Sequence, residues 1–204
     1  VDVGYEVEAP PSLQNIDNDA QKENVFGFGN GTFIALDLIS SGEDAFIKWA
    51  YTVQERYSVL AQASFRGDLA FSAIADPDSD GTKEIVFVEG QGTLPDWPGN
   101  VYILRDNGGS AILEANYTLG NGGGRGAPSL ADIDNDAKEE VIIATYYGVR
   151  VFDYDGSSLT PKSWSTSNND GKINGAIVIY DIDRDDEYEL IYTTHTAICH
   201  SSKT

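Results

Sequence analysis

An acidic segment that recurs four times constrains the fold of this chain more than any other feature. The clearest copy runs from Asp132 to Ala144 and reads Asp-Ile-Asp-Asn-Asp-Ala-Lys-Glu-Glu-Val-Ile-Ile-Ala. Carboxylates at its positions one, three, five and nine repel one another unless a counterion is present, and Ca²⁺ takes about six to eight oxygen ligands in such loops. The apolar run that follows predicts a buried β-strand. Each copy is therefore predicted to be an acidic turn that leads into a strand.

The four copies are spaced like the blades of a β-propeller. Their first positions are Asn15, Asp76, Asp132 and Asp181, so the steps are 61, 56 and 49 residues. Repeats of this length suit a blade of four antiparallel strands whose loops vary in length. The sequence therefore predicts an all-β chain with four propeller repeats, of which the last is incomplete.

Composition supports an all-β fold and excludes some partners. The chain has 204 residues, 41% of them hydrophobic, with 21 Gly, 11 Tyr and 8 Phe, and it shows no long amphipathic helical pattern. A net charge of −20 argues against nucleic acid and anionic membranes, which attract basic surfaces. The four loops hold fifteen of the 33 carboxylates (three, four, four and four), and four bound Ca²⁺ ions would bring the charge to −12.

The repeats divide the chain into five segments. An N-terminal strand occupies residues 1–10, and the blades are expected at 11–66, 67–124, 125–172 and, in part, 173–204. The last repeat lacks a fourth strand, and the alternating residues Val1–Val7 are able to supply one. The strand either closes a four-bladed ring within the chain or completes a blade of a neighbouring copy. A third alternative is that the chain is one piece of a larger propeller.

Aromatic residues are expected mainly between blades. Trp49, Tyr117 and Trp164 stand at similar points of the predicted outer strands, where packing between sheets is expected in preference to a ligand platform. The insertion at residues 89–100 contains Trp97 and replaces a short hairpin. It is either a binding loop or a segment whose Trp folds over a blade edge.

Other local features favour an extracellular protein. The single cysteine, Cys199, excludes an internal disulfide framework, and no Cys/His cluster suggests zinc. No targeting segment or membrane span is visible, and the start at Val1 suggests a processed product or a fragment. The sequons at Asn30 and Asn116 are able to carry N-glycans. Calcium is abundant outside cells, which suits loops of modest affinity.

The loop pattern resembles the FG-GAP/VCBS repeats of integrin α-subunit-like β-propellers, over nearly the whole chain. In that family the loop between the first and second strands of a blade binds Ca²⁺. The resemblance implies up to four calcium sites with side-chain ligands at positions one, three, five and nine and a backbone carbonyl at position seven. The implied residues are Asn15, Asp17, Asp19, Gln21 and Glu23; Asp76, Asp78, Asp80, Thr82 and Glu84; Asp132, Asp134, Asp136, Lys138 and Glu140; and Asp181, Asp183, Asp185, Glu187 and Glu189. For each loop, the alternative is an acidic surface hairpin without metal.

The sequence also departs from the family pattern. Only the second loop keeps glycine at position six, as Gly81, where a left-handed backbone is expected. Ala20 and Ala137 would each lose about 1 kcal/mol in that conformation, whereas Asp186 tolerates it better. Asn15 lowers the charge of the first site, which is expected to be the weakest. Family members usually have more blades than four, so ring closure is an open question.

No catalytic constellation is evident. His195 and His200 lie in the last predicted strands without a nucleophile pattern, and Cys199 is expected to be a packed side chain. The carboxylate pairs are already explained by the loops, and the glycines of 120–126 precede a strand, which disfavours a phosphate-binding loop.

Three functional hypotheses follow. The first is a secreted or surface-displayed, calcium-stabilised adhesion module that binds protein or glycan without turnover. The second is a structural subunit of an extracellular assembly that self-associates through its N-terminal strand. The third is a domain of a polysaccharide-degrading enzyme, since similar repeats occur in some lyases.

Overall fold

The computed structural model consists of four antiparallel sheets, and its described residues include no helix. It describes residues 10–28, 31–38, 45–53, 70–89, 98–121, 123–163, 173, 175–194 and 198–201. The expectation of an all-β chain is confirmed. The N-terminal strand Val1–Val7, the sequon at Asn30, Trp97, Trp164 and His195 all lie outside these residues, so the three alternatives for the N-terminal strand stay hypotheses.

Each sheet takes its strands from one continuous stretch of chain, in sequence order. Sheet 1 contains β1 (Ser12–Gln14), β2 (Glu23–Gly27), β3 (Thr32–Leu38) and β4 (Ala45–Thr52). Sheet 2 contains β5 (Ala70–Ala75), β6 (Glu84–Glu89), β7 (Pro98–Asp106) and β8 (Ala111–Asn121). Sheet 3 contains β9 (Ser129–Ala131), β10 (Glu140–Thr145), β11 (Gly148–Tyr154) and β12 (Leu159–Pro161). Sheet 4 has three described strands, β13 (Val178–Tyr180), β14 (Glu189–Thr193) and β15 (Ile198–Ser201). The predicted segment boundaries stay predictions.

The second strands are the most buried because they run through the middle of each sheet. All six residues of β10 are buried, as are five of the six in β6, which matches their continuous apolar sequences. Short polar turns then reverse the chain, as at Gly156, whose φ of 88° suits glycine.

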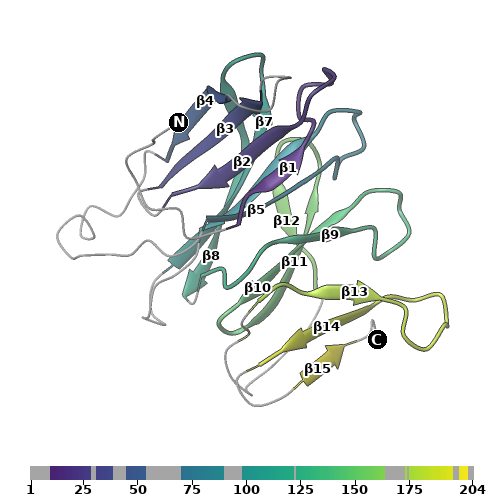
Figure 1. Cartoon of the computed structure of the whole chain (residues 1–204). Coiled ribbons are helices and arrows are strands. Elements are labelled where there is room, and N and C mark those ends of the chain that lie inside the picture. Colours follow the sequence, from purple (N-terminus) through teal and green to yellow (C-terminus); the bar gives the residue numbers. More distant parts are fainter. Residues whose placement is uncertain are drawn as a thin grey trace.

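Consecutive sheets pack face to face, and a separate apolar core fills each interface. Phe33 of sheet 1 stacks on Phe87 of sheet 2, with ring centroids 4.0 Å apart. Tyr117 of sheet 2 lies against Phe152 of sheet 3 at 4.8 Å, and Ile142 and Leu190 share the core between sheets 3 and 4. The first strands follow one another, with β1 against β5, β5 against β9 and β9 against β13. Sheets 1 and 4 therefore lie at opposite ends of the row (Figure 1).

Trp49 and Tyr117 occupy the positions predicted for them. Trp49 is 3% exposed in the core between sheets 1 and 2, and its indole N–H donates to Asp106 Oδ1 at 2.7 Å. Tyr117 packs against the core between sheets 2 and 3. Both aromatic side chains thus hold neighbouring sheets together, as expected.

Candidate metal centre

The four acidic segments join the first and second strands of the four sheets, and three of them share one hydrogen-bonded scaffold. In the second loop, the carboxylate of Asp76 accepts the N–H groups of Asp80 and Gly81, both at 3.0 Å. Asp132 and Asp181 accept the equivalent N–H groups of the third and fourth loops at 2.9–3.2 Å. The carboxylate at position one therefore organises each of these turns.

Positions four and six of the same three loops have a left-handed backbone. The residues are Ser79 and Gly81, Asn135 and Ala137, and Arg184 and Asp186, with φ between 61° and 93°. Ala137, at φ 72°, adopts the conformation in which alanine was expected to be strained. The tight turn that brings the carboxylates together is thus preserved where glycine is absent.

The first loop has a different turn, because its first residue is Asn15. Its amide offers one acceptor oxygen, and its Nδ2 donates to the Asp19 carbonyl at 2.5 Å. Asn18 has a φ of 63°, but Ala20 is not left-handed. The left-handed conformation in which strain was expected is therefore not adopted by Ala20, so that condition is not met at this residue.

The glutamate at position nine is buried in every loop, and its surroundings distinguish the second loop from the others. Three of these glutamates accept a backbone N–H from position two at 2.7–2.8 Å, in the pairs Ile16–Glu23, Ile133–Glu140 and Ile182–Glu189. In the second loop this position is Pro77, which has no N–H. Glu84 is 1% exposed, and its Oε2 has no hydrogen-bond partner.

The second loop therefore contains a destabilised buried carboxylate. Burial, reinforced by the charge of Asp78, raises the pKa of Glu84 to about 8, against a hydrogen bond from the Thr82 hydroxyl that lowers it. Burial also raises the pKa of Asp78, and the charges of Asp80 and Asp76 add to this effect. Among the described residues, no Lys or Arg forms an ion pair with Asp76, Asp78 or Glu84. This donor set fits a hard divalent cation, which would neutralise the excess charge.

The structure brings together most of the predicted ligands. Carboxylate oxygens lie within 4.8 Å of one another in each of the sets Asp17, Asp19 and Glu23; Asp76, Asp78 and Glu84; Asp132, Asp134 and Asp136; and Asp181, Asp183 and Glu189. Asp80, Asp185 and Glu140 fall outside these four sets, and Glu140 forms a fifth set with Asp134 and Asp153. At position five, Asp19, Asp80, Asp136 and Asp185 accept the N–H of position seven, from Gln21, Thr82, Lys138 and Glu187 respectively, at 2.5–2.9 Å. The assignment of these residues as calcium ligands stays a prediction.

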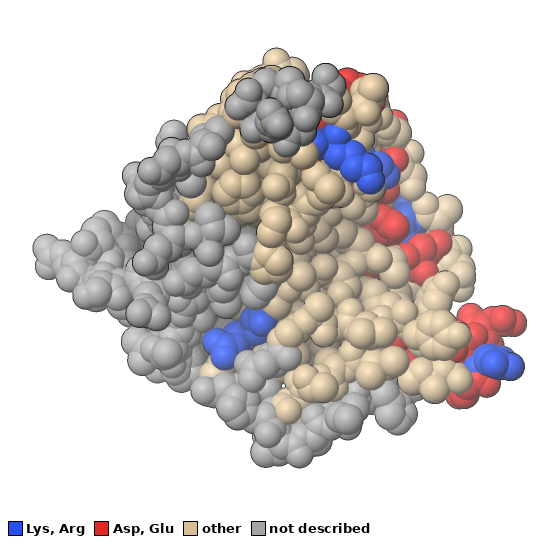
Figure 2. All heavy atoms as spheres, viewed as in Figure 1, with Lys and Arg blue, Asp and Glu red and all other residues tan. Residues whose placement is uncertain are grey.

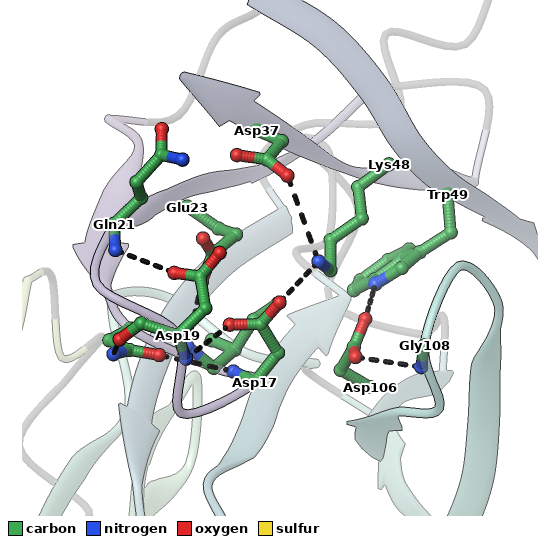
Figure 3. Close-up of polar contacts among 11 residues, drawn as sticks. Asp17, Asp19, Gln21, Glu23, Asp37, Lys48, Trp49, Asp106 and Gly108 are labelled. Carbon is green, nitrogen blue, oxygen red and sulfur yellow. Dashed lines mark hydrogen bonds and ion pairs between the residues drawn. The ribbon is translucent and has the colours of Figure 1, made fainter. Parts of the chain in front are cut away.

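Sequence reasoning missed two lysines that enter the first and third loops. Lys48 Nζ lies 2.5 Å from Asp17 Oδ2 (Figure 3). Lys162 Nζ lies 2.6 Å from Asp134 Oδ2 and 2.8 Å from Glu140 Oε1. Each lysine is about thirty residues or less from its loop in sequence, and neither belongs to the acidic pattern. The signal that could have found them is the rarity of basic residues, since the chain has only 13 Lys and Arg.

The second loop also contacts sheet 3. Ser79 Oγ donates to the Ala137 carbonyl at 2.8 Å, and the Glu139 N–H donates to the Pro77 carbonyl at 3.1 Å. A Cβ built on Gly156 would lie 2.7 Å from Asp78 Oδ2, so the turn between β11 and β12 closes over this loop as well. The second loop is thus flanked by the third, which helps to explain the burial of Asp78.

Acidic side chains gather along one edge of the face shown in Figure 2. Figure 2 shows Asp and Glu concentrated along the edge where Figure 1 places the loops between first and second strands. Two of the other candidates, Cys199 and His200, belong to β15, where only the backbone is described, so the expectation for them stays a prediction. None of the described residues forms a helix long and apolar enough to cross a membrane.

Comparisons with known proteins show similarity of fold. No protein-family model matches the sequence, and no curated protein matches it. Among solved structures, the Pseudomonas aeruginosa PilY1 C-terminal domain is similar with a TM-score of 0.59 and 16% identity, over 92% of this chain and 44% of that one. A Bacillus licheniformis rhamnogalacturonan lyase is similar with a TM-score of 0.55 and 15% identity, over 91% of this chain and 40% of that one. The chain thus spans less than half of either structure.

Proposed function

We propose that the chain belongs to an extracellular, calcium-stabilised β-propeller that binds a protein or glycan ligand without turnover. Support comes from four sheets that each carry an acidic loop at the same topological place, a pattern that resembles FG-GAP/VCBS repeats. The observation that carries the proposal is Glu84, a buried carboxylate with one unpartnered oxygen beside Asp76 and Asp78. A buried charge of this kind requires a compensating cation or a proton.

In the second loop, Asp76, Asp78 and Glu84 would hold the ion, with Asp80 and the Thr82 carbonyl as further oxygen ligands. The bound ion would neutralise carboxylates that otherwise repel one another. Because the folded loop gathers these groups and the unfolded chain does not, calcium stabilises the folded state by linkage, by about 2.7 kcal/mol at a hundred times Kd. The role of calcium here is structural, and no reaction step is assigned to it.

Adhesion or ligand binding fits the remaining features better than catalysis does. The sequon residue Asn116 is exposed on β8, where a glycan could be accommodated. The Pseudomonas neighbour supports the fold, and at 16% identity it leaves the partner unspecified. We therefore infer an extracellular location and a ligand of protein or glycan class.

A polysaccharide-degrading domain is the second candidate, because the other structural neighbour is a rhamnogalacturonan lyase. At 15% identity this likeness extends to the fold alone. The two candidates differ in one measurement, since a lyase converts rhamnogalacturonan to unsaturated products that absorb ultraviolet light. The adhesion proposal expects no such product from the purified chain at any calcium concentration.

Calcium binding is tested by titration and by thermal melting of the purified chain. We expect heat of binding in calorimetry and a melting temperature that falls when EDTA replaces calcium. Glu84→Gln should weaken calcium binding, whereas Lys83→Met, a change at the neighbouring half-buried position, should leave it unchanged. An unchanged melting curve in EDTA together with no heat of binding would refute the proposal.

A further inference from the structure

Lys162 occupies the place in the third loop where a metal ion would be expected. Its ammonium contacts Asp134 Oδ2 at 2.6 Å, Glu140 Oε1 at 2.8 Å and Asp153 Oδ1 at 2.5 Å. Oxygens of these same three carboxylates form one of the compact acidic sets. Glu140 is 1% exposed and also accepts the Ile133 N–H, so both of its oxygens have partners. The third loop therefore already contains a neutralising cation.

Lys48 enters the first loop in a similar way. Figure 3 shows its ammonium between Asp17 and Asp37, at 2.5 Å from Asp17 Oδ2 and 3.8 Å from Asp37 Oδ2. The lysine side chain is 10% exposed, so this charge is largely removed from water. Neutralisation is less complete than in the third loop, because Glu23 Oε1 keeps no hydrogen-bond partner.

The two lysines come from the same structural position. In sheet 1, Ala35 pairs with Trp49 and Leu36 pairs with Ile47, so Lys48 is the extra residue of a bulge in β4. In sheet 3, Lys162 follows Pro161, which pairs with Phe152, and the Lys162 N–H donates to the Val151 carbonyl at 2.8 Å. Ala35 and Val151 are equivalent, because each pairs with the residue two places after the loop glutamate.

Sheet 2 has the opposite charges at this position. Ile103 pairs with Ala115 and Leu104 pairs with Leu113, so the extra residue of the bulge is Glu114. Glu114 accepts hydrogen bonds from Arg105 and, at 2.8 Å, from the Tyr154 hydroxyl. Sheets 1 and 3 thus combine an aspartate on the third strand with a lysine that lies in the fourth strand (Asp37–Lys48) or directly after it (Asp153–Lys162). Sheet 2 has the pair Arg105–Glu114 instead.

Because sheet 2 has Glu114 where sheets 1 and 3 have a lysine, no lysine from this position neutralises the second loop. Glu114 stands where a lysine would reach the loop, and its charge adds to those around Glu84 and Asp78. Pro77 removes the backbone N–H that the other loops provide, and Glu84 Oε2 stays unpartnered in a residue that is 1% exposed. A carboxylate oxygen of Glu84 also lies within 4.8 Å of oxygens of Asp76 and Asp78, so the buried side chain is directed into this acidic set.

We propose that Lys48 and Lys162 are tethered cations that replace a divalent ion in the first and third loops. The second loop has no such lysine and depends on a bound divalent cation. This inference rests on the proposed function, since it takes calcium as the ion of the second loop. It departs from the expectation of a site in every repeat. In the third loop the ammonium of Lys162 already contacts two of the predicted ligands, Asp134 and Glu140, and its charge would repel a calcium ion there.

The first test removes the tethered charge. Lys162→Met keeps an unbranched side chain, one atom shorter than lysine, and leaves Asp134, Glu140 and Asp153 without their cation. In EDTA we expect its melting temperature to fall by roughly 5 °C. With calcium present, native mass spectrometry should detect one more bound Ca²⁺ than in the parent chain. Arg150→Met, at an exposed position of β11 in the same sheet and outside the loop, is the matched control and should change neither value. Lys48→Met is expected to lower stability in EDTA in the same way.

The second test installs a lysine in sheet 2. The double variant Arg105→Asp/Glu114→Lys gives this sheet the charge order of sheets 1 and 3. One bound Ca²⁺ should be lost relative to the parent chain, and the sensitivity of the melting temperature to EDTA should decrease. This variant keeps the inference testable if Lys162→Met fails to fold.

The outcomes separate the inference from the proposed function. If the parent chain binds calcium but the count is unchanged in both Lys162→Met and the double variant, the tethered-cation inference is refuted and calcium binding stands. If the parent chain binds no calcium, the proposed function fails, and with it the dependence of the second loop on a divalent ion. In that case the stability of Lys162→Met in EDTA still decides whether Lys162 neutralises the third loop.

Discussion

Replacing Glu84 by glutamine should stabilise the chain in calcium-free buffer and destabilise it in calcium. Glu84 is 1% exposed, and burial raises its pKa to about 8, whereas its ordinary value is 4.5. Between these values the folded state retains a proton that the unfolded state has released. Without calcium, the stability of the parent chain therefore falls as the pH rises from about 4.5 to 8.

The magnitude follows from the width of this interval. About three and a half pH units at about 1.4 kcal/mol per unit give about 5 kcal/mol as an upper limit above pH 8. Glutamine cannot ionise and avoids this loss. Without calcium, the free energy of unfolding of Glu84→Gln should equal that of the parent chain at pH 4.5. The difference in favour of the variant should grow through pH 8 and then level off. In saturating calcium at pH 8 the parent chain should be the more stable of the two, because its ionised carboxylate then binds the cation.

Urea denaturation followed by tryptophan fluorescence, at several pH values in EDTA and again in calcium, measures both differences. Glu140→Gln is the matched control in the third loop. Burial raises the pKa of Glu140 as well, but hydrogen bonds from Lys162 and the Ile133 N–H act in the opposite direction. The stability that Glu140→Gln gains over the parent chain in EDTA at high pH should therefore be smaller. A difference between Glu84→Gln and the parent chain that does not vary with pH would refute the reasoning.

Three further predictions concern the fold. Trp49→Phe removes the donor to buried Asp106, so urea denaturation should show a loss of about 1–3 kcal/mol; no loss would mean that the bond contributes nothing. Ala137→Gly relieves a φ of 72° and should raise stability by about 0.5–1 kcal/mol, whereas Ala20→Gly should lower it; equal effects would contradict the difference between the two turns. Hydrogen bonds from Ser158 and Ser157 lower the pKa of Asp155 to about 2, so the turn is stabilised at neutral pH and loses this stabilisation as the pH falls from about 4 through 2. Asp155→Asn should therefore be less acid-sensitive in thermal melts than the parent chain, and identical acid transitions would contradict this assignment.

The strands were largely predictable, because each sheet is local in sequence. The apolar runs at Ile85 and Val141 became the buried strands β6 and β10, and the acidic segments became the turns before them. The buried position of Trp49 also followed from the repeat. Whether four such sheets belong to a closed propeller depends on contacts between distant sheets, which a pattern of local repeats does not specify.

The candidate site was only half predictable. The loop carboxylates are close in sequence, and their spacing alone brings them together. The roles of Lys48 and Glu114 depend on a bulge, and a shift of one residue in strand register reverses the side of the sheet to which a side chain points. Lys162 lies directly after the end of β12. Pro77 was visible in the sequence, and its missing N–H became meaningful only when Glu84 was found beside it.

The hydrogen bonds between the second and third loops have a consequence for a chain under mechanical load. Ser79 and Pro77 are joined to Ala137 and Glu139 at the rim, on the side where the acidic turns emerge. A force that separates sheet 2 from sheet 3 at this rim would have to break both hydrogen bonds. An ion that orders the second loop would therefore also restrain the third loop against such a force.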